Sequence, residues 1–487
     1  MKRVFLVIVD ALTSRVVTPA VREGRLPNLA ALAERGVLRE ECVSIFPSIT
    51  PAATAALVTG AYPKESGIAG AVWYDPDRED LAYYADDHWA ILNLGVTEYF
   101  RGFLTRLNYE RLQTDTVFDM AREAGDTSAC VNLMWFRGPQ EHPLHKPWLL
   151  DTLTWGEMPS SVMGPDVLVV GDFVRHDGRS GEEWDLPLAG MPNRWGFRDR
   201  STSEAVLRMA EEAAFADVNV LYFPDNDFES HQVGPRESLP VVEAVDETLG
   251  QLFERFGGVD RFLAGNAIVL TGDHSHDPMP GDETQTIDLN AATPGFRVAQ
   301  LGRGFGERDD VLIGPNMRAA NVYFRDRSDA PGFADLVLKE PRVDQVVWSE
   351  KEAIHVRTAD RGRLTFRRDD AGTPDEHGNR WSYDGNLTAV DGTVKDGTLF
   401  FGDYPNAFER LEGGCFTASG DLWLTARPGH EFGLPETKPH PGGAHGSLHR
   451  SDSVAPFIAA GFETATVPER PRITDVTSMI AAERGWR

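Results

Sequence analysis

The chain has 487 residues and a large excess of acidic side chains, 75 Asp and Glu against 48 Lys and Arg, for a formal net charge of −27. This charge argues against non-specific nucleic-acid binding through a basic surface and against adhesion to anionic lipid. The three cysteines are far apart and form no C-x-x-C pattern, so the sequence indicates neither a disulfide framework nor a thiolate zinc site.

No stretch of the chain is apolar over the roughly 20 residues that a membrane-spanning helix needs. The start of the chain resembles a signal peptide only faintly, because its apolar run is short and ends at Asp10 without a small-residue cleavage site. We therefore expect a soluble, cytoplasmic protein that binds neither a membrane nor a nucleic-acid duplex. The sequence does not indicate an oligomeric state.

The first predicted strand is the apolar run Val4–Val9, which has the length and β-branched character of a strand buried on both faces of a parallel sheet. Asp10 follows it directly. Ligands of open α/β sheets bind outside the carboxyl ends of strands, so this carboxylate is either a functional group or simply the end of the strand. Residues 24–38, with leucines at near-helical spacing, predict a helix that packs on the sheet.

The next segment presents a single hydroxyl at the start of a predicted helix. Thr50 is a preferred N-cap residue, and Pro51 suits the first helical position. The residues Ala52–Val58 favour a helix, which Gly60 would end. An anionic group beside Thr50 would meet free backbone N–H groups and the positive end of the helix dipole. The alternative is an ordinary capped surface helix.

Residues 62–89 are rich in aromatic, acidic and glycine residues without periodicity, which predicts an ordered loop beside the site. Trp73 and Tyr74 could stack on a substrate ring, although aromatic residues more often pack inside a protein. A buried strand is predicted at residues 128–134. Arg137, just after that strand, could contact a phosphate or lie on the surface.

A second buried strand, Val218–Phe223, follows a predicted helix at residues 204–215 and leads into a segment with potential metal ligands. Asp227 and His231 are four residues apart there, close enough on one helical turn to bind a single ion. This spacing also arises often by chance.

A third buried strand, Ala267–Gly272, follows a predicted amphipathic helix at residues 241–256. It leads directly into Asp273 and His274, so an Asp and a His stand side by side at a strand's carboxyl end. The alternative is a loop aspartate beside a surface histidine.

Residues 281–424 have short alternating segments broken by Asp, Gly and Asn, which predict a β-rich insertion. The catalytic core would then comprise residues 1–280 and 425–487, with a closing helix at residues 473–483. His445 lies beyond the insertion in the sequence G-G-A-H-G-S, where glycines would let the backbone approach a ligand closely. The alternative for this stretch is a flexible loop whose histidine faces water.

Together these segments supply three carboxylates and three imidazoles, a mixture that suits zinc better than magnesium or calcium. Six ligands suggest two ions, and two ions about 4 Å apart can clamp an in-line displacement at phosphorus. Thr50 is the natural nucleophile, because metal coordination can make its alkoxide accessible near neutral pH. The six candidate ligands are Asp10, Asp227, His231, Asp273, His274 and His445.

Five motifs in this order resemble the type I phosphodiesterase/nucleotide pyrophosphatase family of the alkaline phosphatase superfamily. They are the strand-ending Asp10, F-P-x-x-T with L-V-T-G-x-Y-P, P-D-N-D-x-x-x-H-x-x-G-P, D-H and A-H-G, spanning residues 10–446. The resemblance implies an α/β fold: an alkaline-phosphatase-like core with a largely parallel central sheet flanked by helices. It also implies a small phosphate-ester or nucleotide substrate, and a threonine that becomes transiently phosphorylated or nucleotidylated.

The resemblance further implies two zinc ions, or other divalent transition metals, and divides the ligands between them. One zinc would be held by Asp227, His231 and His445, and the other would be surrounded by Asp10, Thr50, Asp273 and His274.

The chain departs from the family pattern near the nucleophile. Phosphodiesterases of the family carry an Asn downstream of the nucleophile that binds a non-bridging phosphate oxygen, but residues 52–58 contain none. Residues 66–68 read S-G-I where relatives read H-G-I, and residues 70–75 lack the family's Asn-containing loop. The oxyanion donor and the natural substrate therefore stay open.

The main expectation is a phosphodiesterase/nucleotide pyrophosphatase, and the alternative on the same site is a phosphomonoesterase. A monoesterase would need positive charge on the terminal phosphate oxygens, for which Arg137 is the candidate. A sulfatase is disfavoured because no cysteine begins a C-x-P-x-R motif. The alternative from another class is an inert metal-binding scaffold.

Overall fold

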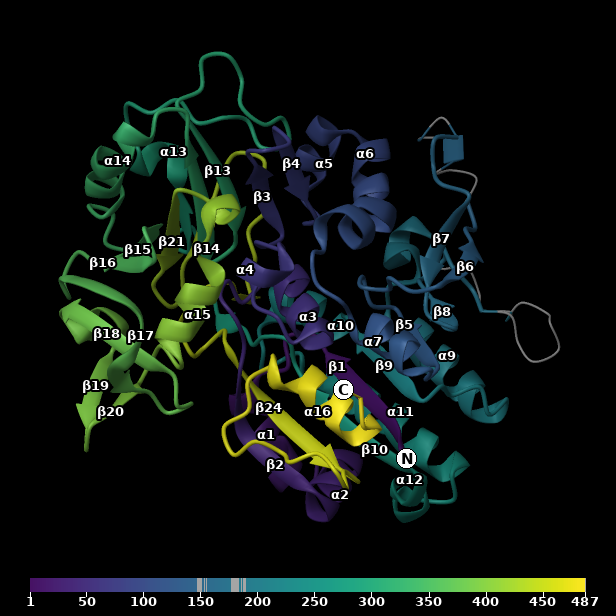
Figure 1. Cartoon of the computed structure of the whole chain (residues 1–487). Helices are drawn as coiled ribbons and strands as arrows, with labels where there is room; N and C mark the ends of the chain where they lie inside the picture. Colours follow the sequence, from purple (N-terminus) through teal and green to yellow (C-terminus); the bar gives the residue numbers. More distant parts are fainter. Residues whose placement is uncertain are drawn as a thin grey trace.

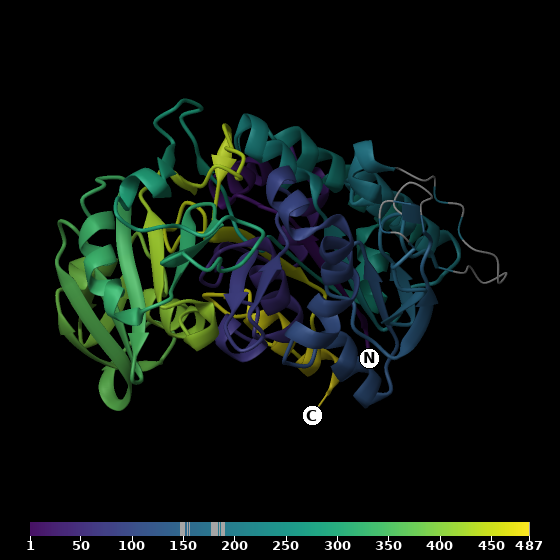
Figure 2. The ribbon, with the colours of Figure 1, turned by 90° about the horizontal axis from the view of Figure 1, so that it is seen from above.

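The computed structural model describes residues 1–146, 151–152, 154, 156–176, 184, 186 and 190–486. In this part of the chain, two large sheets with their helices lie side by side (Figure 1). Seen from above, the strands of residues 311–426 form one end of the molecule, and the two termini lie beneath the other part (Figure 2).

The first sheet is largely parallel, as predicted. Among the described residues it has seven strands, and β24 alone runs opposite to its neighbours. In spatial order the strands are β2 (Val37–Val43), β24 (Val454–Ala460), β10 (Asn266–Thr271), β1 (Arg3–Val9), β9 (Val218–Phe223), β5 (Ser128–Val131) and β8 (Val167–Val169).

Helices cover both faces of this sheet, which is why β1 is apolar from Val4 to Val9. Alternate side chains of β1 pack into two different clusters. One cluster contains side chains of α3 (Thr50–Thr59) and α16 (Asp475–Arg484). The other contains side chains of α2 (Pro27–Arg35) and α11 (Leu239–Arg255).

Several shorter elements complete this part of the structure. The helices are α1 (Ser14–Arg22), α4 (Pro63–Ser66), α5 (His88–Leu94), α6 (Val96–Arg101), α7 (Val117–Ala124), α9 (Asp199–Glu211), α10 (Asp225–Val233) and α12 (Val259–Gly265), with a π-helical segment at Gly102–Arg111 and a 3-10 segment at Met191–Gly196. The paired short strands are β3 (Val72–Asp75) with β4 (Asp80–Tyr83), β6 (Gln140–Pro143) with β7 (Ser161–Gly164), β11 (Asp277–Pro278) with β23 (Gly443–Ala444), and β12 (Thr286–Asp288) with β22 (Glu431–Gly433).

The second sheet is antiparallel throughout and lies within the region predicted to be β-rich, except that its strand β21 extends past residue 424. Its described strands, in spatial order, are β13 (Val311–Asn316), β14 (Ala319–Phe324), β21 (Leu422–Ala426), β15 (Val343–Glu350), β16 (Ala353–Arg357), β17 (Arg363–Pro374) and β18 (Arg380–Gly385). A hairpin and three helices accompany it: β19 (Gly392–Lys395), β20 (Thr398–Phe401), α13 (Leu289–Ala292), α14 (Ala330–Val337) and α15 (Ala407–Gly414). The division into a core and an insertion stays a prediction.

Buried contacts join the two sheets. The largest apolar cluster contains residues of β1, α3 and the second-sheet strand β13. Asn316, at the end of β13, accepts hydrogen bonds from the backbone N–H groups of Ala71 and Val72, at 2.8 and 3.1 Å. It also donates to the Val72 carbonyl at 2.9 Å. Apolar packing and hydrogen bonds therefore join the second sheet to the part of the chain that carries Thr50.

The structure corrects two sequence predictions, for residues 24–38 and for residues 62–89. The helix predicted for residues 24–38 ends at Arg35, and β2 begins at Val37. Gly36, between the two elements, lies so close to β24 that no side chain fits there: a Cβ would lie 2.0 Å from the Ala459 carbonyl oxygen. Residues 62–89 contain α4 and the hairpin β3–β4 rather than a plain loop, because strands of four residues are too short to show a clear alternation.

The three cysteines, Cys42, Cys130 and Cys415, are free and buried, as expected for small apolar side chains. Within the described residues, none of the helices combines the length and apolar character that crossing a membrane requires. The cytoplasmic location stays a prediction.

Candidate metal centre

The carboxyl ends of three neighbouring strands bring candidate residues together. Asp10 ends β1, Asp227 lies in α10 just after β9, and Asp273 and His274 follow β10. Because β10, β1 and β9 are adjacent and parallel, their carboxyl ends meet at the same edge of the sheet. All four side chains are buried.

Thr50 is the first residue of α3, and its hydroxyl faces this edge. The residue in the N-cap position is Ile49, whose backbone is extended, so the predicted N-cap was one residue too late. Instead of capping the helix, Thr50 Oγ1 lies 3.0 Å from His274 Nε2. Gly60 ends the helix as predicted, in the left-handed conformation with φ 72°.

His274 is the centre of the first group. Its Nε2 lies 3.4 Å from Asp10 Oδ1 and 3.4 Å from Asp273 Oδ2. The other oxygens of these carboxylates are bound elsewhere: the Tyr222 hydroxyl donates to Asp10 Oδ2, and the backbone N–H of Ala11 donates to Asp273 Oδ1. In the described part of the chain, Asp10 Oδ1 and Asp273 Oδ2 are buried without a hydrogen-bond partner. A bound cation would satisfy both.

Asp227 is the centre of the second group. Its Oδ1 lies 3.3 Å from Nε2 of His231 and 3.7 Å from Nε2 of His445. It also lies 2.9 Å from Nε2 of His276, a residue that the sequence analysis did not select. Three buried histidines therefore meet at one carboxylate oxygen.

Hydrogen bonds at Nδ1 fix the ring orientation of two of these histidines. The Nδ1 of His231 donates to the Gly443 carbonyl at 2.7 Å, and the Nδ1 of His445 donates to the Ser48 carbonyl at 2.8 Å. In the neutral form of each ring the single N–H is then on Nδ1, so Nε2 keeps a lone pair, which is the arrangement of metal-binding histidines. Among the described residues, the buried Nε2 of His445 has no hydrogen-bond partner.

The charges of the site also favour cations. Burial raises the pKa of Asp10 well above its usual value, and the nearby carboxylates of Asp273 and Asp227 raise it further. Burial alone would raise the pKa of Asp227, but His231 and His276 hold it well below the usual range. Three carboxylates so close together in a buried site need compensating charge. Oxygen and imidazole donors in this mixture fit zinc or another divalent transition metal.

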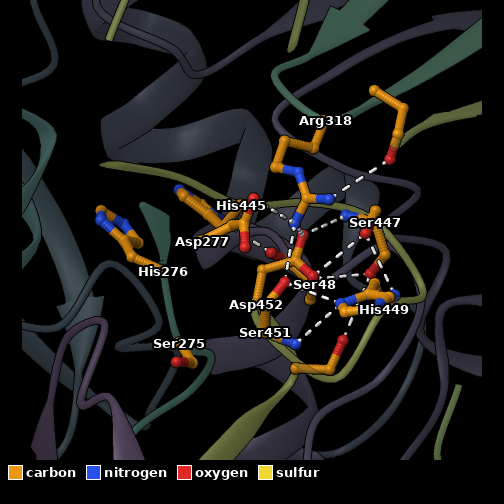
Figure 3. Close-up of polar contacts among 12 residues, drawn as sticks. Ser48, Ser275, His276, Asp277, Arg318, His445, Ser447, His449, Ser451 and Asp452 are labelled. Atoms are coloured by element: carbon orange, nitrogen blue, oxygen red, sulfur yellow. Dashed lines mark hydrogen bonds and ion pairs between the residues drawn. The ribbon is translucent and has the colours of Figure 1, made fainter. Parts of the chain in front are cut away.

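A buried ion pair holds the loop that carries His445 (Figure 3). Arg318 Nη1 lies 3.0 Å from Asp452 Oδ2, and both side chains are fully buried. Asp452 accepts hydrogen bonds from the backbone N–H and the hydroxyl of Ser447, at 2.8 and 3.0 Å. The backbone N–H of Arg318 donates to the His445 carbonyl at 2.8 Å. Because Arg318 lies between β13 and β14, the second sheet helps to position His445.

The three predicted substrate contacts have other partners in the structure. Trp73 is buried in the large apolar cluster, and the ring of Tyr74 meets the ring of Phe305 edge-on. Arg137 forms an ion pair with Asp119 at 2.9 Å and also donates to two backbone carbonyls. Their roles in substrate binding stay predictions.

Two residues of the site were missed from the sequence. His276 follows His274 by two residues in D-H-S-H, and this spacing was a usable signal. Tyr222 carries no local signal. Its position depends on the pairing of β9 with β1, which sets Tyr222 opposite Ile8 and its hydroxyl on Asp10.

Comparisons with known proteins identify a family and a similar fold. The family model of type I phosphodiesterase/nucleotide pyrophosphatase matches residues 4–448. No match is found among curated protein sequences. The solved structure of murine ectonucleotide pyrophosphatase/phosphodiesterase 5 is similar with a TM-score of 0.58 and 11% identity, covering 100% of this chain and 96% of that chain. An inactive form of that murine protein with a threonine-to-alanine substitution, in complex with AMP, gives a TM-score of 0.57 with 11% identity and the same coverage.

The family match defines the chain as a hydrolase that acts on phosphate esters. Within that class, the chain belongs to the type I phosphodiesterase/nucleotide pyrophosphatase family, as its motifs predicted. Family membership implies dependence on divalent metal, and the buried Asp and His groups could bind it.

Proposed function

We propose that the chain is a phosphodiesterase/nucleotide pyrophosphatase in which Thr50 attacks phosphorus at a two-zinc site. The observation that carries the proposal is the 3.0 Å approach of Thr50 Oγ1 to His274 Nε2, beside buried oxygens of Asp10 and Asp273 that lack hydrogen-bond partners among the described residues. A hydroxyl is thereby held against a group of candidate metal ligands.

The proposed ligands fall into the two groups described above. Asp227, His231 and His445 would hold one zinc, and Asp10, Thr50, Asp273 and His274 would hold the other. When bound, the two ions supply Lewis acidity, which lowers the pKa of the attacking hydroxyl and stabilises the charge that develops on the phosphate.

Thr50 would carry the phosphoryl or nucleotidyl group between two steps. In the first, Thr50 Oγ1 forms a bond to phosphorus while the bond from phosphorus to the leaving oxygen breaks. In the second, water attacks the same phosphorus and releases the Thr50 hydroxyl. Pro51 has no N–H, and the Ala53 N–H donates to the Ile49 carbonyl at 2.9 Å. The N–H groups of Thr50 and Ala52 precede that first helical bond, so they are the proposed donors to a phosphate oxygen in a chain that lacks the family's Asn.

One observation argues against a phosphate monoester, and a second favours a nucleotide-containing substrate. Arg137, the candidate for the terminal phosphate of a monoester, has its guanidinium bound by Asp119 and by backbone carbonyls. The similar murine protein is seen in complex with AMP, which supports a nucleotide-containing substrate.

Thr50→Ala and Thr50→Ser test the proposal together. The alanine variant should lose nearly all turnover of bis(p-nitrophenyl) phosphate and of a nucleotide p-nitrophenyl ester, while keeping its six other candidate ligands and most of its bound zinc. The serine variant should retain measurable turnover, because its hydroxyl can occupy the same place. Rapid quenching of the wild type followed by mass spectrometry should find phosphate or nucleotide on Thr50.

An alanine variant that keeps zinc and turns over every ester at close to the wild-type rate would overturn the mechanism. A rate on p-nitrophenyl phosphate well above the rates on both diesters would favour the phosphomonoesterase instead.

A further inference from the structure

His276 is arranged like the histidines of the proposed metal site. Its Nδ1 lies 2.8 Å from Ser230 Oγ and its Nε2 lies 2.9 Å from Asp227 Oδ1. His231 and His445 show the same pattern, with Nδ1 bound to a protein oxygen and Nε2 directed at Asp227. The His276 side chain is fully buried, and its ring is nearly parallel to that of His445, at 4.9 Å.

We propose that His276 is a direct ligand of the ion at Asp227, as a third imidazole beside His231 and His445. This inference rests on the two-metal site proposed above. The ligand atoms of the four side chains all lie within 4.8 Å of one another. That spread is close to what bonds of about 2.1 Å to a single ion allow.

A simple hydrogen bond explains the arrangement less well than a shared ion does. The Nδ1 proton of His445 is committed to the Ser48 carbonyl, so its Nε2 lone pair faces Asp227 Oδ1, itself a lone-pair atom. In its neutral form His231, whose Nδ1 donates to the Gly443 carbonyl, directs a second Nε2 lone pair at the same oxygen. His276 adds a third nitrogen to the same oxygen. Ser230 Oγ can accept the Nδ1 proton of His276, which leaves a third Nε2 lone pair there. One cation satisfies all of these atoms.

The consequence is an asymmetric pair of sites. Three imidazoles and one carboxylate make a nitrogen-rich, four-ligand set that favours zinc. The Asp10 site offers two carboxylates, a hydroxyl and one imidazole, which is richer in oxygen. We expect the wild type to bind two zinc ions, with the tighter of the two at Asp227.

The test measures Zn²⁺ binding to His276→Gln by competition with a chromophoric chelator. Loss of a direct ligand should weaken the tighter site by more than about 100-fold, beyond the roughly 10–100-fold that loss of a group supporting a ligand produces. His276→Cys should recover much of the affinity, because a thiolate also binds zinc. His440→Gln is the matched control: its ring packs on His231 at 4.4 Å, but its Nδ1 is bound to Glu431. The control should keep wild-type zinc affinity.

A second measurement uses the folded wild type and so does not depend on the variants. With Co²⁺ in both sites, NMR should show exchangeable imidazole N–H signals shifted by the ion from four histidines: His231, His274, His276 and His445. Three such signals, or a His276→Gln variant with wild-type zinc affinity, would overturn the inference and leave the Thr50 mechanism standing. A wild type that binds no zinc would overturn both proposals.

Discussion

Asp10 illustrates, at the scale of a single residue, how the site depends on charge. Its side chain is buried beside Asp273 and Asp227, and burial followed by these two carboxylates raises its pKa well above the usual value. In the metal-free protein an ionised Asp10 is therefore unfavourable. A bound cation would reverse this effect, since metal ligands bind in their deprotonated forms.

The pH dependence of the metal-free protein should reveal this carboxylate. Because the folded pKa of Asp10 exceeds its unfolded value of about 3.9, the stability that it contributes is complete below about pH 4 and is lost as pH rises through the folded pKa. Asp10→Asn removes this ionisation. In chelator, the stability of the variant relative to the wild type should therefore rise as pH increases above about 4, which urea unfolding at several pH values measures.

The matched control for this experiment is Glu254→Gln, because Glu254 lies exposed on α11. The stability of the Glu254→Gln variant relative to the wild type should change little with pH. If the Asp10→Asn difference is the same from about pH 4 to pH 8, the carboxylate does not have the raised pKa described here.

At the scale of an element, α3 is held in place at both ends. Its first residue places the Thr50 hydroxyl against His274, and Gly60 ends it with φ 72°. The helix is buried on all sides, and the Thr477 hydroxyl of α16 donates to the Leu57 carbonyl near its end at 3.0 Å. The position of the nucleophile therefore depends on the fit of the whole helix.

Gly60→Ala should destabilise the protein. A side chain at this positive φ is strained, and the added Cβ would lie 3.3 Å from both the Thr474 carbonyl oxygen and Thr477 Cβ. We expect a loss of about 1–2 kcal/mol in the free energy of unfolding, measured with urea. Gly125→Ala is a matched control at the end of α7, with φ 81° and open space around its Cβ, so it should cost less. Equal losses would show that crowding at Gly60 is unimportant.

The long buried elements were the most predictable from sequence. The strand β9 was predicted with its observed bounds, because six buried residues leave an unbroken apolar run. The edge strand β2 was missed: its residues Val37–Glu41 are partly or fully exposed, so no apolar run marks them. Five of the six candidate ligands could be selected because they follow strand ends, where ligands of α/β sheets bind, and His445 because glycines flank it. His276 was missed although the D-H-S-H spacing marks it, whereas the role of Tyr222 depends on the pairing of β9 with β1, which no local pattern encodes.

At the scale of the whole molecule, the second sheet takes part in building the site (Figure 3). Arg318, between β13 and β14, contacts Asp452 and donates its backbone N–H to the His445 carbonyl. Asp277, which follows His276, lies 3.6 Å from the same guanidinium. Burial alone would raise the pKa of Asp277, but Arg318 and other partners hold it below the usual value. His445 and His276 therefore both lie beside residues that Arg318 holds in place.

Arg318→Met should consequently affect both stability and metal binding. The change leaves Asp452 fully buried without its cationic partner, which typically costs about 3–5 kcal/mol in the free energy of unfolding. It should also weaken zinc binding, because the loop that holds His445 loses its anchor to the second sheet.

Arg297→Met is the control, since Arg297 pairs with Asp310 at 2.6 Å on the surface beside β13 and its loss should leave both measurements nearly unchanged. Urea unfolding and chelator competition on the two variants would decide. If Arg318→Met unfolds like the wild type and binds zinc as tightly, the second sheet does not hold the site together in the way that the buried contacts indicate.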